Sequence, residues 1–161
     1  VKKLDYECEL AVVLGKDARD VPAGQTRDYI FGYTILNDVS ARDVQTAHKQ
    51  WYFGKSLDGF TPIGPCIVTA DAFADYPPRL GIRSFVNGEK RQDSNTALQI
   101  FDIDHVIAEL SQGMTMKAGT IIATGTPAGV GMGMDPPQFL KPGDVVRCEI
   151  EGIGTLTNPV K

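Results

Sequence analysis

The sequence predicts a single domain that is mostly β or α+β. Its 161 residues suit one domain with a sizeable core. Short apolar runs rich in valine, isoleucine and leucine are separated by turns, which the 17 glycines and 10 prolines supply. Helical patterns are few and do not alternate regularly with the strands, which argues against a parallel βαβ architecture.

The first expected element is a buried strand within residues 5–14, which Gly15 ends. Glu7 and Glu9 open this otherwise apolar run, and alternate residues of a strand share a face. Their side chains start roughly 7 Å apart, and at an effective dielectric of about 20 their charges repel by roughly 2 kcal/mol. Solvent, basic partners such as Lys2 or Lys3, or a bound cation would compensate them.

The next elements surround Asp38. Residues 31–36 form a second expected strand, and Ser40 followed by Asp43 resembles a capping box that begins a helix to about residue 49. Asp38 either supplies a third carboxylate to Glu7 and Glu9 or is a turn residue that helps to cap this helix. Three carboxylates would form an all-oxygen site of the kind that Mg²⁺ or Mn²⁺ prefers.

The rest of the chain continues the β pattern. A helical turn is expected near residues 25–30, a long loop at 51–65, a hairpin at 82–92 around Asn87-Gly88, and a helix at 104–112 capped by Asp102 or Asp104. Further strands are expected at residues 67–69, 121–123, 145–150 and 155–158.

Composition narrows the class of protein. The formal charge of −4 comes without a basic patch, which argues against a nucleic-acid partner, and no apolar run is long enough to span a membrane. Cys8, Cys66 and Cys148 lie in apolar contexts and indicate buried, reduced thiols in a cytoplasmic protein. The chain opens on Val1, so we expect residues upstream in the natural protein.

Four motifs occur in an order that resembles the fumarylacetoacetate hydrolase family. They are Glu7-x-Glu9, Asn-Asp-Val-Ser-Ala-Arg-Asp-Val-Gln at residues 37–45, Gly-Lys-Ser at 54–56, and Thr-Gly-Thr-Pro-Ala-Gly-Val-Gly at 124–131. Among its members, the chain looks most like 2-hydroxyhepta-2,4-diene-1,7-dioate isomerases and fumarylacetoacetate hydrolase domain-containing proteins.

The resemblance implies a fold, a cofactor and a substrate class. The fold would be mixed sheets rolled into a barrel-like sandwich with few short helices, usually in a homodimer. Glu7, Glu9 and Asp38 would bind Mg²⁺ or Mn²⁺, with Ca²⁺ as a further candidate. The substrates would be small 2-oxo or enol dicarboxylic acids.

Further residues receive roles by their positions in the motifs. Lys55 matches the family's active-site lysine, and its alternative is a solvated loop residue. Gln45 matches a glutamine near the substrate, and its alternative is a helix-surface residue. Arg42 is a candidate carboxylate anchor or else a structural salt bridge, perhaps with Asp43. The hydroxyl of Thr126 and the N–H groups of its glycine-rich turn would bind a substrate carboxylate.

The general base is not found among these motifs. Hydrolytic members use a histidine–glutamate pair upstream of the Glu-x-Glu strand, so we expect the base upstream of residue 1. Two histidines are present. His105 is expected to be a surface or capping residue, and His48 lies where it could approach the mouth of a pocket.

We therefore expect residues 1–161 to be a single catalytic domain that lacks an N-terminal segment. The reaction would be metal-dependent isomerisation or C–C hydrolysis in aromatic catabolism. An oxaloacetate-type decarboxylase or tautomerase is the alternative reaction. A non-catalytic metal- or ligand-binding module is the alternative of another class.

Overall fold

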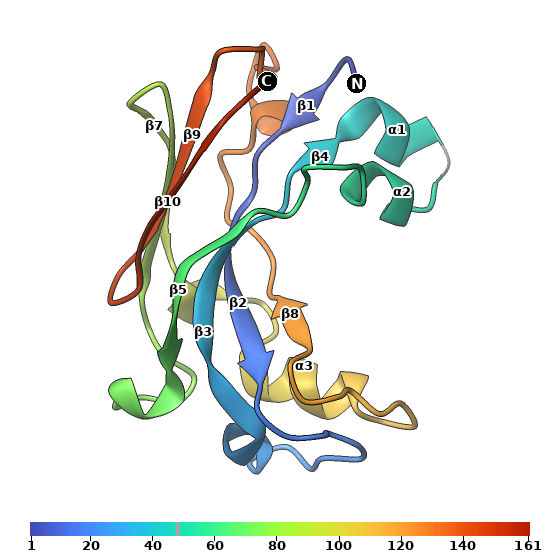
Figure 1. The fold of residues 1–161 in the computed structure, drawn as a ribbon, viewed down its shortest axis with the longest axis vertical. Coiled ribbons are helices and arrows are strands. Elements are labelled where there is room, and N and C mark those ends of the chain that lie inside the picture. The colour runs from blue at the N-terminus through green and yellow to red at the C-terminus, as the bar shows by residue number, and fades with distance from the viewer. Residues whose placement is uncertain (48) are drawn as a thin grey trace.

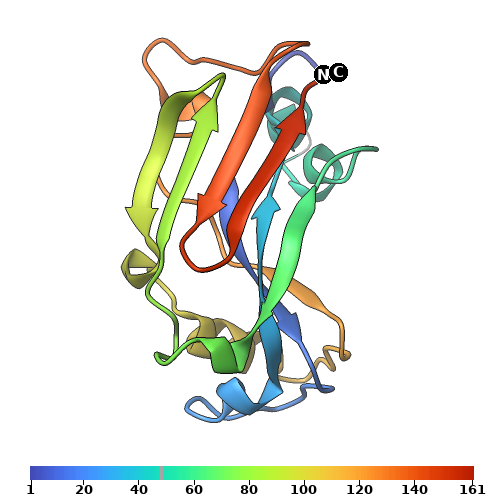
Figure 2. The same cartoon turned by 60° about the vertical axis from the view of Figure 1, so that its left-hand side comes forward.

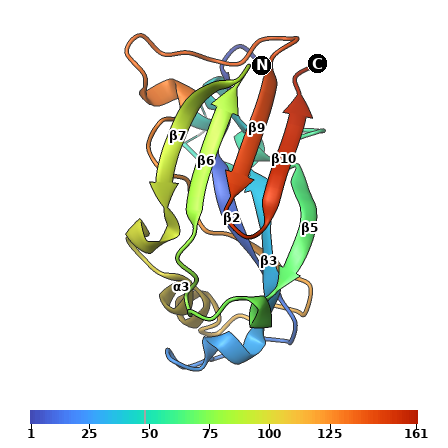
Figure 3. The ribbon, with the colours of Figure 1, turned by 90° about the vertical axis from the view of Figure 1, so that its left-hand side faces the viewer.

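The computed structural model describes residues 1–47 and 49–161, which form a sandwich of two antiparallel sheets (Figures 1 and 3). One sheet has the order β5-β3-β2-β8 and the other β10-β9-β6-β7. The strands of the first are β2 (Cys8–Leu14), β3 (Ile30–Asn37), β5 (Ile63–Thr69) and β8 (Ile121–Ala123). Those of the second are β6 (Gly81–Val86), β7 (Glu89–Asn95), β9 (Val145–Ile150) and β10 (Gly154–Pro159).

Short elements complete the fold. A two-residue pair joins β1 (Leu4–Asp5) to β4 (Ser40–Ala41). In the residues described, the α-helices are α1 (Arg42–Ala47), α2 (Tyr52–Lys55) and α3 (Ile103–Leu110). The 3-10 turns there are η1 (Thr26–Tyr29), η2 (Ala70–Ala72), η3 (Thr96–Leu98) and η4 (Gly131–Gly133). The prediction of a mostly β domain with few short helices is therefore confirmed.

The core fills the space between the two sheets. Alternate residues of β2 and β3 point toward the second sheet, and apolar side chains of β6 and β9 pack against them from that sheet. The fully buried members include Leu10, Val12, Tyr33, Ile35, Val146 and Ile150. Because this face of β2 is filled, the glutamates of the same segment are left to the opposite face.

Helices α1 and α2 lie at the end of the sandwich that also holds β1, β4 and both chain termini (Figures 1 and 2). Gly54 of α2 packs so closely on α1 that an added Cβ would come within 2.8 Å of the Cβ of Gln45. A side chain at this position would separate the helices, so Gly54 fixes where the next residue, Lys55, lies.

Several local predictions can be compared with these elements. The hairpin is confirmed, and Asn87 and Gly88 both have the positive φ of a type I′ turn. Asp102 caps α3 by accepting a hydrogen bond from the N–H of His105 at 2.8 Å. The capping role of Ser40 is wrong, because Ser40 belongs to β4 and its hydroxyl donates to the carbonyl of Asp38 at 2.9 Å.

The cysteines also differ from expectation at one position. Cys8 and Cys148 are buried free thiols, as predicted, whereas Cys66 is exposed. Cys66 lies on β5, an edge strand whose residues are mostly exposed or half-buried. In the part of the chain that the structure describes, no helix has the length and apolar character to cross a membrane.

Candidate metal centre

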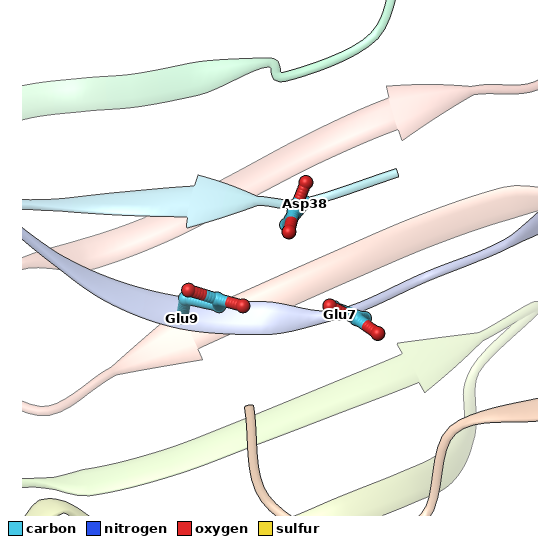
Figure 4. Close-up of side chains that lie close together, drawn as sticks. All are labelled: Glu7, Glu9 and Asp38. Carbon is cyan, nitrogen blue, oxygen red and sulfur yellow. The ribbon is translucent and has the colours of Figure 1, made fainter. Parts of the chain in front are cut away.

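Three carboxylates converge beside the start of β2. Glu7 directly precedes β2, Glu9 lies in it, and Asp38 directly follows the neighbouring strand β3 (Figure 4). Each offers a carboxylate oxygen, and these three oxygens lie within 4.8 Å of one another. The glutamates are buried and Asp38 is half-buried. The sequence therefore identified a cluster that the fold assembles.

Backbone pairing explains why the carboxylates meet. The register of β2 and β3 places Cys8 opposite Asn37, so Glu7 and Asp38 extend the same ladder by one residue. The Asp38 N–H donates to the Glu7 carbonyl at 2.8 Å, and the Glu7 N–H donates to Oδ1 of Asn37 at 3.1 Å. These two bonds hold the backbones that carry Glu7 and Asp38 side by side.

Lys55 bridges two of the carboxylates. Its Nζ donates to Oε2 of Glu7 at 2.8 Å and to Oδ2 of Asp38 at 2.6 Å. Its side chain is only 18% exposed, so this ammonium is not the solvated loop lysine of the alternative interpretation. The packing of Gly54 on α1 sets the position of Lys55, the next residue of α2.

Arg42 contacts the same glutamate from the other side. Its Nη2 donates to Oε1 of Glu7 at 2.6 Å, its Nε to Oδ2 of Asp5 at 3.0 Å, and its Nη1 to Oε1 of Gln45 at 3.1 Å. Arg42 and Gln45 are both buried. The salt bridges of Arg42 are therefore made to Asp5 and Glu7, whereas Asp43 accepts the N–H of Lys2.

Asp5 is a component of the site that sequence reasoning missed. It is completely buried and accepts hydrogen bonds from Arg42 and from the N–H groups of Tyr6, Gly131 and Met132. Gly131 is required there because an added Cβ would lie 2.8 Å from Oδ1 of Asp5. The carboxylate thus ties η4 to Arg42, and through Arg42 to Glu7.

Glu9 has different surroundings. Its Oε2 accepts the N–H of Gly125 at 2.8 Å, and its side chain is almost fully buried. Burial raises the pKa of the Glu9 carboxyl to about 7; the Gly125 N–H opposes the increase, while Asp38 and Glu7 add to it. Burial thus favours the protonated form of Glu9, and a cation bound there would have to displace a proton near neutral pH.

Residues 124–130, here called the Thr126 turn, run along the edge of β2 beside Glu9. The Thr126 hydroxyl donates to the carbonyl of Cys8 at 2.9 Å and accepts from Nε2 of Gln92 at 2.7 Å. A cavity of about 430 Å³ adjoins this turn. Its lining includes Gly125, Thr126, Gln99, Leu98 and Phe101.

The donor set fits a hard divalent cation. With all groups ionised, the carboxylates of Asp5, Glu7, Glu9 and Asp38 and the cations of Arg42 and Lys55 leave a formal charge of −2. Oxygen ligands of this kind suit Mg²⁺, Mn²⁺ or Ca²⁺, which complete their coordination with water or substrate.

The histidine that the structure describes, His105, does not belong to this cluster. His105 is exposed on α3 and stacks on Phe101 with 4.8 Å between ring centroids, which agrees with the expected surface position. His48 lies outside the described residues, so its predicted approach to the pocket mouth stays a prediction.

Comparisons with known proteins agree with the motifs. The family model of the fumarylacetoacetate (FAA) hydrolase C-terminal domain matches residues 1–161. An oxaloacetate tautomerase, YisK of Bacillus subtilis (strain 168), is 49% identical over 158 residues, which are 98% of this chain and 52% of that protein. The chain therefore spans about half the length of the curated relatives it matches.

Solved structures show the same fold. A fumarylacetoacetate hydrolase from Exiguobacterium antarcticum is 52% identical with a TM-score of 0.96. The match covers 100% of this chain and 57% of that hydrolase chain. A 2-hydroxyhepta-2,4-diene-1,7-dioate isomerase from Mycobacterium marinum is 45% identical with a TM-score of 0.87, and the match covers 98% of this chain and 58% of that isomerase chain. The chain belongs to the fumarylacetoacetate hydrolase family.

Proposed function

We propose that this chain carries a divalent-metal-dependent active site for small 2-oxo or enol dicarboxylic acids, which it isomerises or cleaves by C–C hydrolysis. The observation that carries the proposal is the cluster of Glu7, Glu9 and Asp38 with Lys55 bonded to two of them. Bound there, Mg²⁺ or Mn²⁺ would polarise the 2-oxo group and stabilise the enolate that these reactions share.

Lys55 is the proposed catalytic residue. Its ammonium lies within hydrogen-bond distance of two proposed ligands, so it reaches the place where a chelating substrate would develop negative charge. A cation held there stabilises an enolate or a carboxylate without rearranging during the reaction. Partial burial strengthens this interaction relative to water.

Thr126 and Gln45 are the proposed substrate contacts. The Thr126 turn lies beside Glu9 and next to the cavity. The Thr126 hydroxyl proton and the Gly125 N–H are already donated to Cys8 and Glu9, so a substrate carboxylate would be received by other backbone N–H groups of the turn. Gln45 presents its carbonyl oxygen to Arg42, which orients its NH₂ group as a donor. The contacts of Arg42 to Asp5 and Glu7 favour a positioning role over its role as a direct anchor.

Tautomerisation of oxaloacetate is the second candidate. The 49%-identical relative is an oxaloacetate tautomerase, and keto–enol exchange needs the enolate stabilisation that the site is proposed to supply. The isomerase of 45% identity supports the first candidate. Both relatives are longer than this chain, so each activity is proposed for the full-length protein.

A substrate panel tests the proposal in the full-length protein. Oxaloacetate, acylpyruvates and hydroxymuconate-type dienes are assayed with Mg²⁺ or Mn²⁺ and with EDTA, for wild type, Asp38→Asn and the control Asp43→Asn. We expect at least one substrate to be turned over, with loss of turnover in EDTA and in Asp38→Asn only. Metal binding without turnover of any substrate would favour a non-catalytic binding module.

A further inference from the structure

Gln92 lies in β7, in the sheet opposite the metal centre, and none of its surface is exposed. Its side chain crosses to the first sheet and to the Thr126 turn. A fully buried amide must have hydrogen-bond partners, because an unpaired polar group in the interior costs about 1–3 kcal/mol. The partners of Gln92 therefore show what the residue does.

All four hydrogen-bonding positions of the Gln92 amide are occupied. Oε1 accepts from the N–H of Cys8 at 3.1 Å and from the hydroxyl of Ser84 at 2.7 Å. Nε2 donates to the hydroxyl of Thr126 and to the carbonyl of Pro127, each at 2.7 Å. An amide offers two donors and two acceptor positions, so this set is complete.

Two backbone partners fix which way the amide faces. The Cys8 N–H can only donate, so the atom that meets it must be the oxygen. The Pro127 carbonyl can only accept, so the atom that meets it must be the nitrogen. Rotating the amide by 180° would break both bonds, and the side chain is consequently held in one orientation.

The contacts of Gln92 fall where strand pairing is missing. β8 pairs with β2 from Ala11 to Val13 and ends before Cys8. At Cys8 the edge of β2 is bonded by side chains, because Gln92 accepts its N–H and Thr126 donates to its carbonyl. Cys8 is the residue between the two glutamates, so this bonding fixes the backbone from which both project.

Gln92 also sets the Thr126 turn. Its NH₂ group orients the Thr126 hydroxyl and the Pro127 carbonyl, and the adjacent Gly125 donates its N–H to Glu9. One amide therefore links the ligand-bearing strand and the proposed substrate turn to the second sheet.

We infer that Gln92 is a positioning residue for the metal centre, holding Cys8 between Glu7 and Glu9 and fixing the Thr126 turn against them. The inference rests on the proposed metal site and deepens it. Side chains that orient ligands from behind typically change metal affinity by about 10- to 100-fold when they are replaced.

Mn²⁺ binding by the full-length protein, measured by calorimetry, tests the inference. Gln92→Met keeps the length of the side chain but removes all four bonds, and we expect it to weaken Mn²⁺ binding about tenfold. Thr96→Val is the matched control, since the buried Thr96 hydroxyl bonds only to Leu80 and Pro78 among the described contacts. It should lower the thermal midpoint and leave the Mn²⁺ affinity unchanged.

The outcomes separate the inference from the proposed function. If wild type and Asp38→Asn bind Mn²⁺ equally, or neither binds it, the metal centre itself is refuted. If wild type binds, Asp38→Asn does not, and Gln92→Met binds like wild type, only the positioning role is overturned. Equal weakening in Thr96→Val and Gln92→Met would also overturn it, because general destabilisation would then account for both.

If Gln92→Met does not fold, NMR of the wild-type protein still tests the inference. The Gln92 NH₂ protons should exchange slowly with solvent, and their NMR signals should shift when Mg²⁺ saturates the site. Fast exchange, or signals that Mg²⁺ leaves unmoved, would refute the role of Gln92.

Discussion

Glu7 and Glu9 are two residues apart but are held in opposite ways. Glu7 is bonded to two cations, Lys55 and Arg42, whereas the contact of Glu9 is the neutral N–H of Gly125. A metal bound at Glu7 would therefore share its ligand with side-chain charges. At Glu9 it would compete with a proton, since burial raises the pKa of that carboxyl to about 7. One cluster thus combines a charge-compensated end and a proton-binding end.

The contrast predicts the largest loss of stability at Arg42. Arg42→Met removes the cation bonded to the buried Asp5 and leaves Glu7 with Lys55 alone, so the free energy of unfolding should fall by about 3–5 kcal/mol. Urea unfolding at pH 7 measures it. In the control Arg83→Met the lost pair with Asp93 is exposed, and the loss should be below about 1 kcal/mol. Equal losses would show that Glu7 does not depend on Arg42.

Lys55 should matter for turnover more than for binding. Lys55→Met removes the cation proposed to stabilise the enolate, and kcat for the active substrate should fall by about 10²–10³-fold. Calorimetry should show Mn²⁺ binding at least as tight as in wild type, because an ammonium no longer occupies Glu7 and Asp38. Lys117→Met, which breaks an exposed pair with Asp17, is the control. Wild-type kcat in Lys55→Met would contradict the assignment.

Glu9 should destabilise the metal-free protein above neutral pH. Its folded pKa of about 7 exceeds the ordinary value of 4.5, so the folded state binds the proton more tightly. The free energy of unfolding should therefore fall as the pH rises from about 4.5 to 7. In EDTA, Glu9→Gln should match wild type below about pH 4.5 and exceed it by about 3 kcal/mol at pH 8. A stability difference independent of pH would contradict this.

The smallest expected effect is the pH dependence of metal binding. A proton on Glu9 must leave before the carboxylate binds a cation, so Mn²⁺ affinity should weaken by about tenfold between pH 8 and pH 6. Calorimetry at several pH values, in buffers of different ionisation enthalpy, measures both the affinity and the proton released. Release of no proton at pH 6 would show that Glu9 is already ionised there.

The sequence predicted the cluster of Glu7, Glu9 and Asp38 because simple strand rules bring these residues together. Two glutamates on one face of a strand, and an aspartate at the end of the next strand, need only a strand period and one antiparallel pairing. The hairpin at Asn87-Gly88 and the cap at Asp102 follow from equally local rules. The hairpin and the cap are fixed within a few residues of chain, and the carboxylate cluster needs only the pairing of β2 with the next strand, β3.

The remaining parts of the site depend on distant contacts. Gln92 lies in residues 89–95, which are polar throughout, so no local pattern marks it as buried. Asp5 bonds to Arg42, Gly131 and Met132, which are distant from it in sequence. Ser40 matched a helix cap, but Asp5 pairs with it across 35 residues and draws it into β4. Arg42 was predicted as a carboxylate anchor or a salt bridge, perhaps with Asp43. Its salt bridges go to Asp5 and Glu7, which the pairing of β1 with β4, directly before α1, brings beside it.

The pairing register of β2 and β3 has a consequence for folding. A slip of one residue would reverse the faces of β2, so that the glutamates would enter the core and Cys8 would leave it. A cation that needs Glu7, Glu9 and Asp38 together binds only the correctly aligned pair. Because a ligand stabilises only the state that binds it, a bound metal would stabilise the correct register of β2 and β3 over a shifted one, in addition to its proposed role in catalysis.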